Sequence, residues 1–230
     1  MWKFLSAFCL VLAGAANAQQ AADAVEPEAA GTGAFEGLPA QIAGALEIKQ
    51  AGRPFVASDW MVAAANPHAV KAGADVLAAG GTAADALIAV QVVLGLVEPQ
   101  SSGLGGGAFL VWYDAASGEI TTLDGRETAP LAATPQLFQD ADGEPLRFFD
   151  AVVGGRSVGT PGTPALLAEV HARWGVLEWA SLLTAGETLA DEGFVVSPRL
   201  AQLVASDVER LARFPQTAAY FLPGGAPIRA

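Results

Sequence analysis

The sequence predicts a mixed α/β (α+β) chain whose sheet is incomplete. Two short apolar runs, 108–113 and 119–123, flank a turn at 114–118 and indicate a β-hairpin. About five longer segments carry apolar residues at helical spacing and end at glycine or proline. Two clear strands and two weaker ones are too few to close a sheet against that many helices, so the chain looks unfinished.

The composition is that of a folded, acidic protein. Hydrophobic residues make up 52% of the 230 and charged residues 16%, which argues against disorder of the whole chain. Twelve Lys and Arg against 24 Asp and Glu give a net charge of −12, which disfavours nucleic acid and anionic membranes as partners. Cys9 is the only cysteine, so a disulfide framework and a cysteine-based zinc site are both excluded.

The first 18 residues have the layout of a secretory signal peptide. Lys3 supplies a positive start, residues 4–14 form an apolar run, and Ala16-Asn17-Ala18 matches a cleavage site. We therefore expect a periplasmic or secreted protein that begins at Gln19. Residues 19–53 are rich in Ala, Gly, Glu and Pro and are expected to form a mobile leader, with one helical turn near 42–49.

One strand and two helices are expected next. Residues 55–63 resemble a buried strand. Asn66 and Pro67 have the residue types of a helix N-cap and first helical position, and Gly80-Gly81 ends that helix. Thr82 caps a second helix over 83–97, with Asp85 in a capping-box position. This helix is apolar nearly all round and too short to span a membrane, so it belongs in the core.

The rest of the chain, up to residue 230, forms one unit with the segment from 54. A glycine-rich loop at 101–107 precedes the hairpin, and a polar stretch follows it as far as 149, before a short apolar run at 151–153 that suits a weak strand. Three helices are expected after that, ended by Gly175, Gly193 and Pro215 and covering 164–174, 177–192 and 198–213.

Residues 155–159 match G-x-S-x-G, the serine elbow of α/β-hydrolases. That motif requires a strand directly before the serine and a helix directly after it. Here a proline-rich stretch delays the helix, and His171 stands in the wrong place to act as the base. We interpret Ser157 as a turn residue.

Residues 103–108 match G-x-G-x-x-A, the dinucleotide-binding fingerprint. The fingerprint needs a strand before the glycines and a helix after them, whereas here a helix precedes and a strand follows. We interpret the glycines as residues that permit close packing of backbones. No cofactor is predicted.

The two histidines, His68 and His171, are interpreted as structural. Neither has a second ligand at a spacing typical of a metal site, so no metal is predicted.

Arg126 follows the second strand of the hairpin, in Asp124-Gly125-Arg126-Glu127. An arginine fork there can bind a carboxylate through two hydrogen bonds. The alternative is a local ion pair with Glu127 or Asp124, and the pattern alone favours that pair.

Several segments, taken together and in order, resemble the γ-glutamyltransferase (γ-glutamyltranspeptidase) family. Each is weak alone, but the ordered set is specific and runs from about Ser58 to the end. The segments are Met61-Val62-Ala63, residues 80–86 (GGTAADA), 98–109 (EPQSSGLGGGAF), 123–130 (LDGRETAP) and 159–164 (GTPGTP).

This resemblance implies a fold and a mechanism. The family has the four-layer α/β/β/α sandwich of N-terminal-nucleophile hydrolases, built by a large and a small subunit from one self-cleaving precursor. A threonine at the start of the small subunit attacks the γ-glutamyl amide of glutathione-like donors and passes the acyl group to water, amino acids or peptides. The chain resembles the front of the large subunit, so no catalytic residue is expected in it. Arg126 takes the position of the family's carboxylate-binding arginine.

Two alternatives stay open. Cephalosporin or glutaryl acylases belong to the same family and share the nucleophile, and Arg126 favours a γ-glutamyl donor over theirs. A non-catalytic periplasmic module that binds acidic amino acids would also use an arginine, but it should have two lobes with complete sheets.

Overall fold

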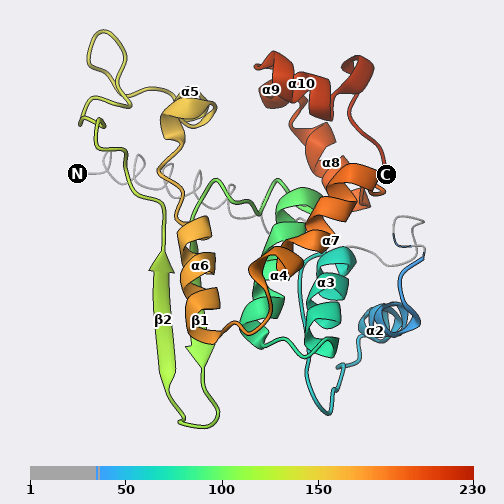
Figure 1. Ribbon diagram of the computed structural model, residues 1–230. Helices are drawn as coiled ribbons and strands as arrows, with labels where there is room; N and C mark the ends of the chain where they lie inside the picture. Colours follow the sequence, from blue (N-terminus) through green and yellow to red (C-terminus); the bar gives the residue numbers. More distant parts are fainter. Residues whose placement is uncertain (1–34, 36) are drawn as a thin grey trace, which may run out of the picture.

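The computed structural model describes Phe35 and residues 37–230, so the predicted signal peptide and about half of the predicted leader lie outside the described residues. In the described residues a small hairpin lies at one edge of the molecule, with helices packed on one side of it (Figure 1). The longer elements are α2 (Ala40–Gln50), α3 (Pro67–Ala78), α4 (Ala83–Val97), β1 (Ala108–Tyr113), β2 (Ile120–Gly125), α6 (Thr163–Trp174), α7 (Trp179–Glu192) and α8 (Pro198–Ser206). The shorter ones are α5 (Phe148–Val152), η2 (Gly155–Ser157), α9 (Val208–Leu211), α10 (Pro215–Phe221) and η3 (Pro223–Gly225).

Helix α4 is the centre of the molecule, with α3 and α7 packed against it (Figure 1). Its start is fixed by the predicted capping box, in which Thr82 and Asp85 exchange backbone and side-chain hydrogen bonds. Ile88 and Val93 on this helix are completely buried. Burial of such a side chain contributes about 1.5–3 kcal/mol, which explains why α4 is apolar around most of its circumference.

The hairpin packs one face against the helices and exposes the other. Strands β1 and β2 pair antiparallel, with Leu110 opposite Leu123. Leu110 lies in a cluster with α6 residues, and Trp112 stacks on Trp174 with ring centroids 4.4 Å apart. The opposite face presents large exposed side chains to solvent: Phe109, Val111, Tyr113 and Ile120. This alternation is the period-two pattern expected of a strand with a single buried face.

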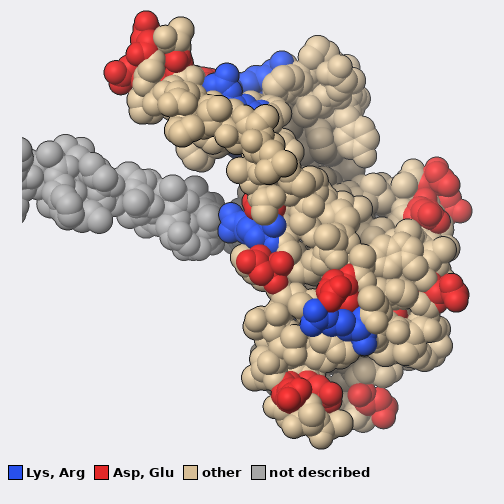
Figure 2. Space-filling view, turned by 60° about the vertical axis from the view of Figure 1, so that its left-hand side comes forward, with Lys and Arg blue, Asp and Glu red and all other residues tan. Residues whose placement is uncertain are grey.

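The C-terminal helices form a separate small cluster. Leu200, Val204 and Leu222 bury one another between α8 and α10. The cluster also contacts the segment after the hairpin, because Arg213 Nη1 donates to the Phe149 carbonyl at 3.0 Å. A space-filling view shows a largely uncharged surface on which basic groups lie beside acidic ones (Figure 2).

The structure confirms the mixed α/β class, the hairpin and the caps of α3 and α4, and it corrects four expectations. Residues 55–63 are not a strand, because no strand in the described part of the chain pairs with them. The weak strand at 151–153 overlaps the end of helix α5. Residues 40–50 form a helix of 11 residues where a single turn was expected. The helix expected over 198–213 breaks at Asp207, and Pro215 opens α10.

No helix in the described part of the chain is long and apolar enough to cross a membrane.

Candidate functional site

Arg126 lies directly after β2 with an exposed side chain. Its backbone N–H donates to Asp124 Oδ1 at 2.9 Å, which fixes the turn. Its Nε lies 3.4 Å from Glu127 Oε1, so the local ion pair that the sequence suggested is present. The side chain is nevertheless 63% exposed, and an exposed pair of this kind contributes little energy. The guanidinium is therefore accessible to a further carboxylate.

Three loops meet behind Arg126. The Gly106 carbonyl accepts hydrogen bonds from the backbone N–H groups of Gly162 and Thr163 and from the Thr163 hydroxyl, at 2.9, 3.1 and 3.2 Å. Thr128 pairs with Thr160 through two backbone hydrogen bonds. The glycine-rich loop, the turn after β2 and the start of α6 thus form one unit, although the sequence separates them by up to 57 residues.

Two glycines permit this meeting. A Cβ atom on Gly162 would lie 2.1 Å from the Gly125 carbonyl oxygen, and one on Gly107 would lie 2.7 Å from Arg126 Cα. Backbone atoms cannot yield as a flexible side chain does, so both positions require glycine. Close packing of backbone segments against one another therefore fixes the position of the Arg126 backbone.

A cavity of about 310 Å³ adjoins this unit, and its lining includes Arg126, Thr128, Thr160 and Glu169. A volume of this order is at the lower end for small-molecule pockets. The cation, two threonines and a carboxylate give it the groups needed to orient a small ligand that carries both charges.

The two rejected motifs behave as the sequence suggested. Ser157 lies in a 3₁₀ turn, and its hydroxyl donates to the Val152 carbonyl at 2.7 Å rather than to a base. The glycine-rich loop follows α4 and precedes β1, the reverse of a dinucleotide-binding loop.

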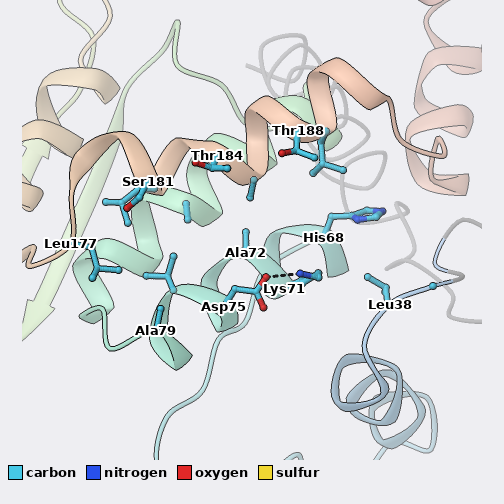
Figure 3. Close-up of a pocket in the computed structure, with 16 residues that line it drawn as sticks. Leu38, His68, Lys71, Ala72, Asp75, Ala79, Leu177, Ser181, Thr184 and Thr188 are labelled. Carbon is cyan, nitrogen blue, oxygen red and sulfur yellow. Dashed lines mark hydrogen bonds and ion pairs between the residues drawn. The ribbon is translucent and has the colours of Figure 1, made fainter.

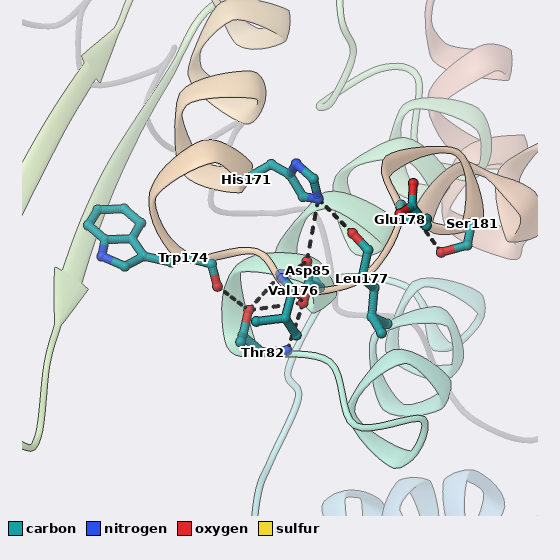
Figure 4. A network of polar contacts seen from close by, with 8 residues as sticks. All are labelled: Thr82, Asp85, His171, Trp174, Val176, Leu177, Glu178 and Ser181. Atoms are coloured by element: carbon teal, nitrogen blue, oxygen red, sulfur yellow. Dashed lines mark hydrogen bonds and ion pairs between the residues drawn. The ribbon is translucent and has the colours of Figure 1, made fainter.

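His171 belongs to a structural network at the start of α4 (Figure 4). Its Nε2 lies 2.8 Å from the Leu177 carbonyl and 3.9 Å from Asp85 Oδ1. Asp85 is fully buried and accepts from the backbone N–H groups of Thr82 and Val176. The network joins the α6–α7 turn to α4.

His68 stands apart from that network, in the first turn of α3. Burial and, to a smaller extent, the charge of Lys71 lower the pKa of His68 below its usual 6.5. Its buried Nε2 has no hydrogen-bond partner in the structure. Among the described residues, no group of three His, Cys, Asp or Glu is placed to hold a metal ion.

A larger cavity, of about 610 Å³, lies between α3 and α7 and shares no lining residue with the cavity beside Arg126. Ser181, Thr184 and Thr188 line its α7 side, and the ion pair of Lys71 with Asp75 lines its α3 side (Figure 3). It is separate from the loops around Arg126.

The sequence reasoning missed one buried cluster, at the end of α4. Glu98 is fully buried, and its carboxylate accepts from Asn66 Nδ2 at 3.1 Å, Gln100 Nε2 at 2.5 Å and Arg199 Nη1 at 3.1 Å. The available signal was a single acidic residue between an apolar helix and a glycine-rich loop.

Comparisons with known proteins point to one family. A family model described as gamma-glutamyltranspeptidase matches residues 69–230. The chain is 42% identical over 176 residues to a glutathione hydrolase proenzyme of Bacillus subtilis (strain 168), covering 76% of this chain and 30% of that protein. It is 36% identical over 182 residues to the acylase ACY 1 proenzyme of Pseudomonas sp. (strain V22), covering 77% and 32%.

Solved structures agree. The gamma-glutamyltranspeptidase of Helicobacter pylori superposes with a TM-score of 0.72 at 30% identity, covering 76% of this chain and 50% of that one. A cephalosporin acylase from Bacillus halodurans gives 0.56 at 31% identity, covering 70% and 30%. The chain spans about a third of the length of these curated relatives.

Proposed function

The chain belongs to the γ-glutamyltranspeptidase family, whose members include glutathione hydrolases and acylases, and from this membership we propose that it is the front part of a γ-glutamyltransferase precursor. In the proposed reaction, a threonine outside this chain attacks the γ-glutamyl amide of a glutathione-like donor and expels the amine. The resulting acyl-enzyme passes its γ-glutamyl group to water, an amino acid or a peptide. The part played by this chain is to hold the donor.

The observation that carries the proposal is the placement of Arg126. A γ-glutamyl group carries a free α-carboxylate that an ordinary peptide bond lacks, and a planar guanidinium can bind it through two parallel hydrogen bonds. Glu127 Oε1 lies 3.4 Å from Nε of the guanidinium, and the Arg126 side chain is 63% exposed. Because three loops fix the backbone around Arg126, the guanidinium is presented to the donor from a rigid base.

The outer face of the hairpin supports the view that the precursor extends beyond this chain. Phe109, Val111, Tyr113 and Ile120 expose apolar side chains on one contiguous sheet face. Soluble proteins cover such a face with another layer. We propose that the remaining part of the precursor, including the small subunit, supplies this layer.

The proposed site of action is outside the cytoplasm. The motif in residues 1–18 supports export, with the mature protein beginning at Gln19 in the periplasm or beyond the cell. N-terminal sequencing of the purified protein checks this. Recovery of intact Met1 on most of the molecules would contradict export.

An acylase is the second candidate, and the relatives named acylases support it. A glutaryl group has the same terminal carboxylate as a γ-glutamyl group but lacks the α-amine. Arg126 alone therefore does not separate the two donors, contrary to the expectation from the sequence. Higher identity and a higher TM-score to the glutathione hydrolase and transpeptidase relatives favour the γ-glutamyl donor.

The test is Arg126→Lys in the full-length precursor, with release of a chromogenic amine from a γ-glutamyl donor as the assay. Lysine keeps the charge but loses the fork. A charge-assisted hydrogen bond is worth about 1.5–3 kcal/mol, so kcat/KM should fall roughly tenfold to a hundredfold. Self-cleavage, followed on a gel, should be unaffected because it involves no substrate carboxylate.

Arg210→Lys is the matched control, since Arg210 is also an exposed arginine paired with a neighbouring carboxylate and lies outside the lining of the cavity beside Arg126. It should leave turnover unchanged. Normal turnover in Arg126→Lys would show that Arg126 forms only a surface ion pair and does not bind the donor. Loss of self-cleavage would show that Arg126 is needed for the structure of the precursor. A glutaryl amide turned over faster than the γ-glutamyl amide by the unmodified enzyme would establish the acylase instead.

A further inference from the structure

Glu98 joins three parts of the chain that are far apart in the sequence: the start of α3, the end of α4 with the loop that follows it, and the start of α8. It ends α4, and its carboxylate accepts from Asn66 at the start of α3, from Gln100 in the next loop and from Arg199 at the start of α8. Asn66 is itself buried and caps α3 by accepting from the His68 backbone N–H at 3.0 Å. A fully buried carboxylate is costly unless it is hydrogen-bonded, and here three donors bond to it.

The backbone of Glu98 also starts the glycine-rich loop. Its carbonyl accepts from the backbone N–H groups of Ser101 and Ser102, both at 3.0 Å. The Ser102 hydroxyl accepts from Gln91 Nε2 on α4 at 2.9 Å. The first half of the loop is therefore fastened to α4 by side-chain and backbone bonds together.

The other end of the same loop backs Arg126. Gly106 carries the three hydrogen bonds from the start of α6, and Gly107 packs directly on Arg126 and Glu127. Between the two fastened ends lie only Gly103, Leu104 and Gly105. A displacement at Glu98 thus has a short covalent path to the backbone of Arg126.

We propose that Glu98 is a positioning residue for the γ-glutamyl site, acting through the glycine-rich loop on Arg126, with Arg199 as the cation that balances it. This inference rests on the proposed function. Glu98 touches no part of the cavity beside Arg126, so its effect is on the geometry of the carboxylate clamp rather than on the reacting atoms.

The informative variant is Glu98→Gln in the full-length precursor. All three partners of the carboxylate are donors, so the new amide turns its own NH₂ group toward a donor in either orientation. We expect KM for a γ-glutamyl donor to rise about threefold to thirtyfold, the range of coupling through a packed network, with a smaller change in kcat.

Asp85→Asn is the matched control. Asp85 is the other fully buried carboxylate of α4, and the change is chemically the same, but its partners lead to the α6–α7 turn and not to the loop. KM should stay at the unmodified value. In an Arg126→Lys background the Glu98→Gln effect should shrink, because the fork it positions is already lost.

The outcomes separate the two proposals. Suppose that Glu98→Gln and Asp85→Asn give the same KM, while Arg126→Lys raises KM. This result would overturn the positioning role of Glu98 and leave the proposed function standing. A normal kcat/KM in Arg126→Lys itself would overturn the donor-binding role of Arg126 that carries the proposed function. If Glu98→Gln does not accumulate as folded protein, Gln100→Ala removes only the loop's bond to the carboxylate, and an unchanged KM there would likewise overturn the role.

Discussion

The two ends of α4 each bury a carboxylate, and the surroundings of the two carboxylates differ. At the start of the helix, Asp85 accepts from the backbone N–H groups of Thr82 and Val176 and lies 3.9 Å from the His171 ring (Figure 4). The partners are neutral backbone and hydroxyl donors together with one histidine. A carboxylate in this position serves as a helix cap and also interacts favourably with the positive end of the helix dipole.

At the end of the helix, Glu98 meets the negative end of the same dipole, so a carboxylate is disfavoured there. Its compensation is the Arg199 guanidinium, brought from 101 residues away. A local cap needs no such partner. The difference indicates that the Asp85 end serves the stability of the helix, whereas the Glu98 end unites distant segments around the loop behind Arg126.

Arg199→Leu provides the most severe test of this contrast. It leaves the fully buried Glu98 without its cation, and removal of one partner of a buried pair costs about 3–5 kcal/mol. The Arg199 side chain is 24% exposed, so we expect the lower end of this range. The free energy of unfolding of the precursor, measured in urea, should fall by about 3 kcal/mol.

Arg173→Leu is its control, because Arg173 pairs with Glu169 on the exposed surface of α6. Arg173→Leu should lower the free energy of unfolding by no more than about 0.5 kcal/mol. Equal costs for the two arginines would mean that Glu98 is not held by charge, and the contrast between the ends of α4 would fail.

Thr82→Ala tests the other end with a smaller expected effect. The Thr82 hydroxyl accepts from the Asp85 backbone N–H at 3.3 Å and donates to the Trp174 carbonyl at 2.8 Å. Loss of an N-cap of this type costs about 1 kcal/mol. We expect that loss in thermal unfolding, with donor KM unchanged and with Thr82→Ser close to the unmodified protein. A raised donor KM would show that this end also reaches the site.

Local signals in the sequence were sufficient to predict the Asp85 end of α4. The Thr82–Asp85 capping box and the Asn66–Pro67 start of α3 depend on residues within one helical turn, so both could be predicted. Pro215 shows the limit of such signals, since proline suits both the end of one helix and the first position of the next.

Long-range features could not be predicted from spacing. Residues 55–63 have the composition of a strand, but a strand forms only with a neighbour, and the described chain supplies none. The pairing of Glu98 with Arg199 depends on how α8 returns to α4, which no local pattern encodes. The significance of Arg126 came from the family resemblance, and its contact with the glycine-rich loop became visible only in the fold.

The smallest expected effect concerns His68, which lies beside the Glu98 end and donates its backbone N–H to Asn66. Burial, and secondly the charge of Lys71, hold the pKa of His68 below 6.5 in the folded protein. The unfolded chain therefore binds a proton more readily, so this histidine's contribution to stability is complete above about pH 6.5 and is lost as the pH falls through the lowered pKa. The free energy of unfolding of the precursor should decrease between pH 7.5 and 5.5 more steeply than that of His68→Gln. Lys71→Gln should lie between the two, because it removes only the smaller cause. Identical slopes for the unmodified protein and His68→Gln would show that the buried Nε2, beside the cavity between α3 and α7, accommodates a proton without cost.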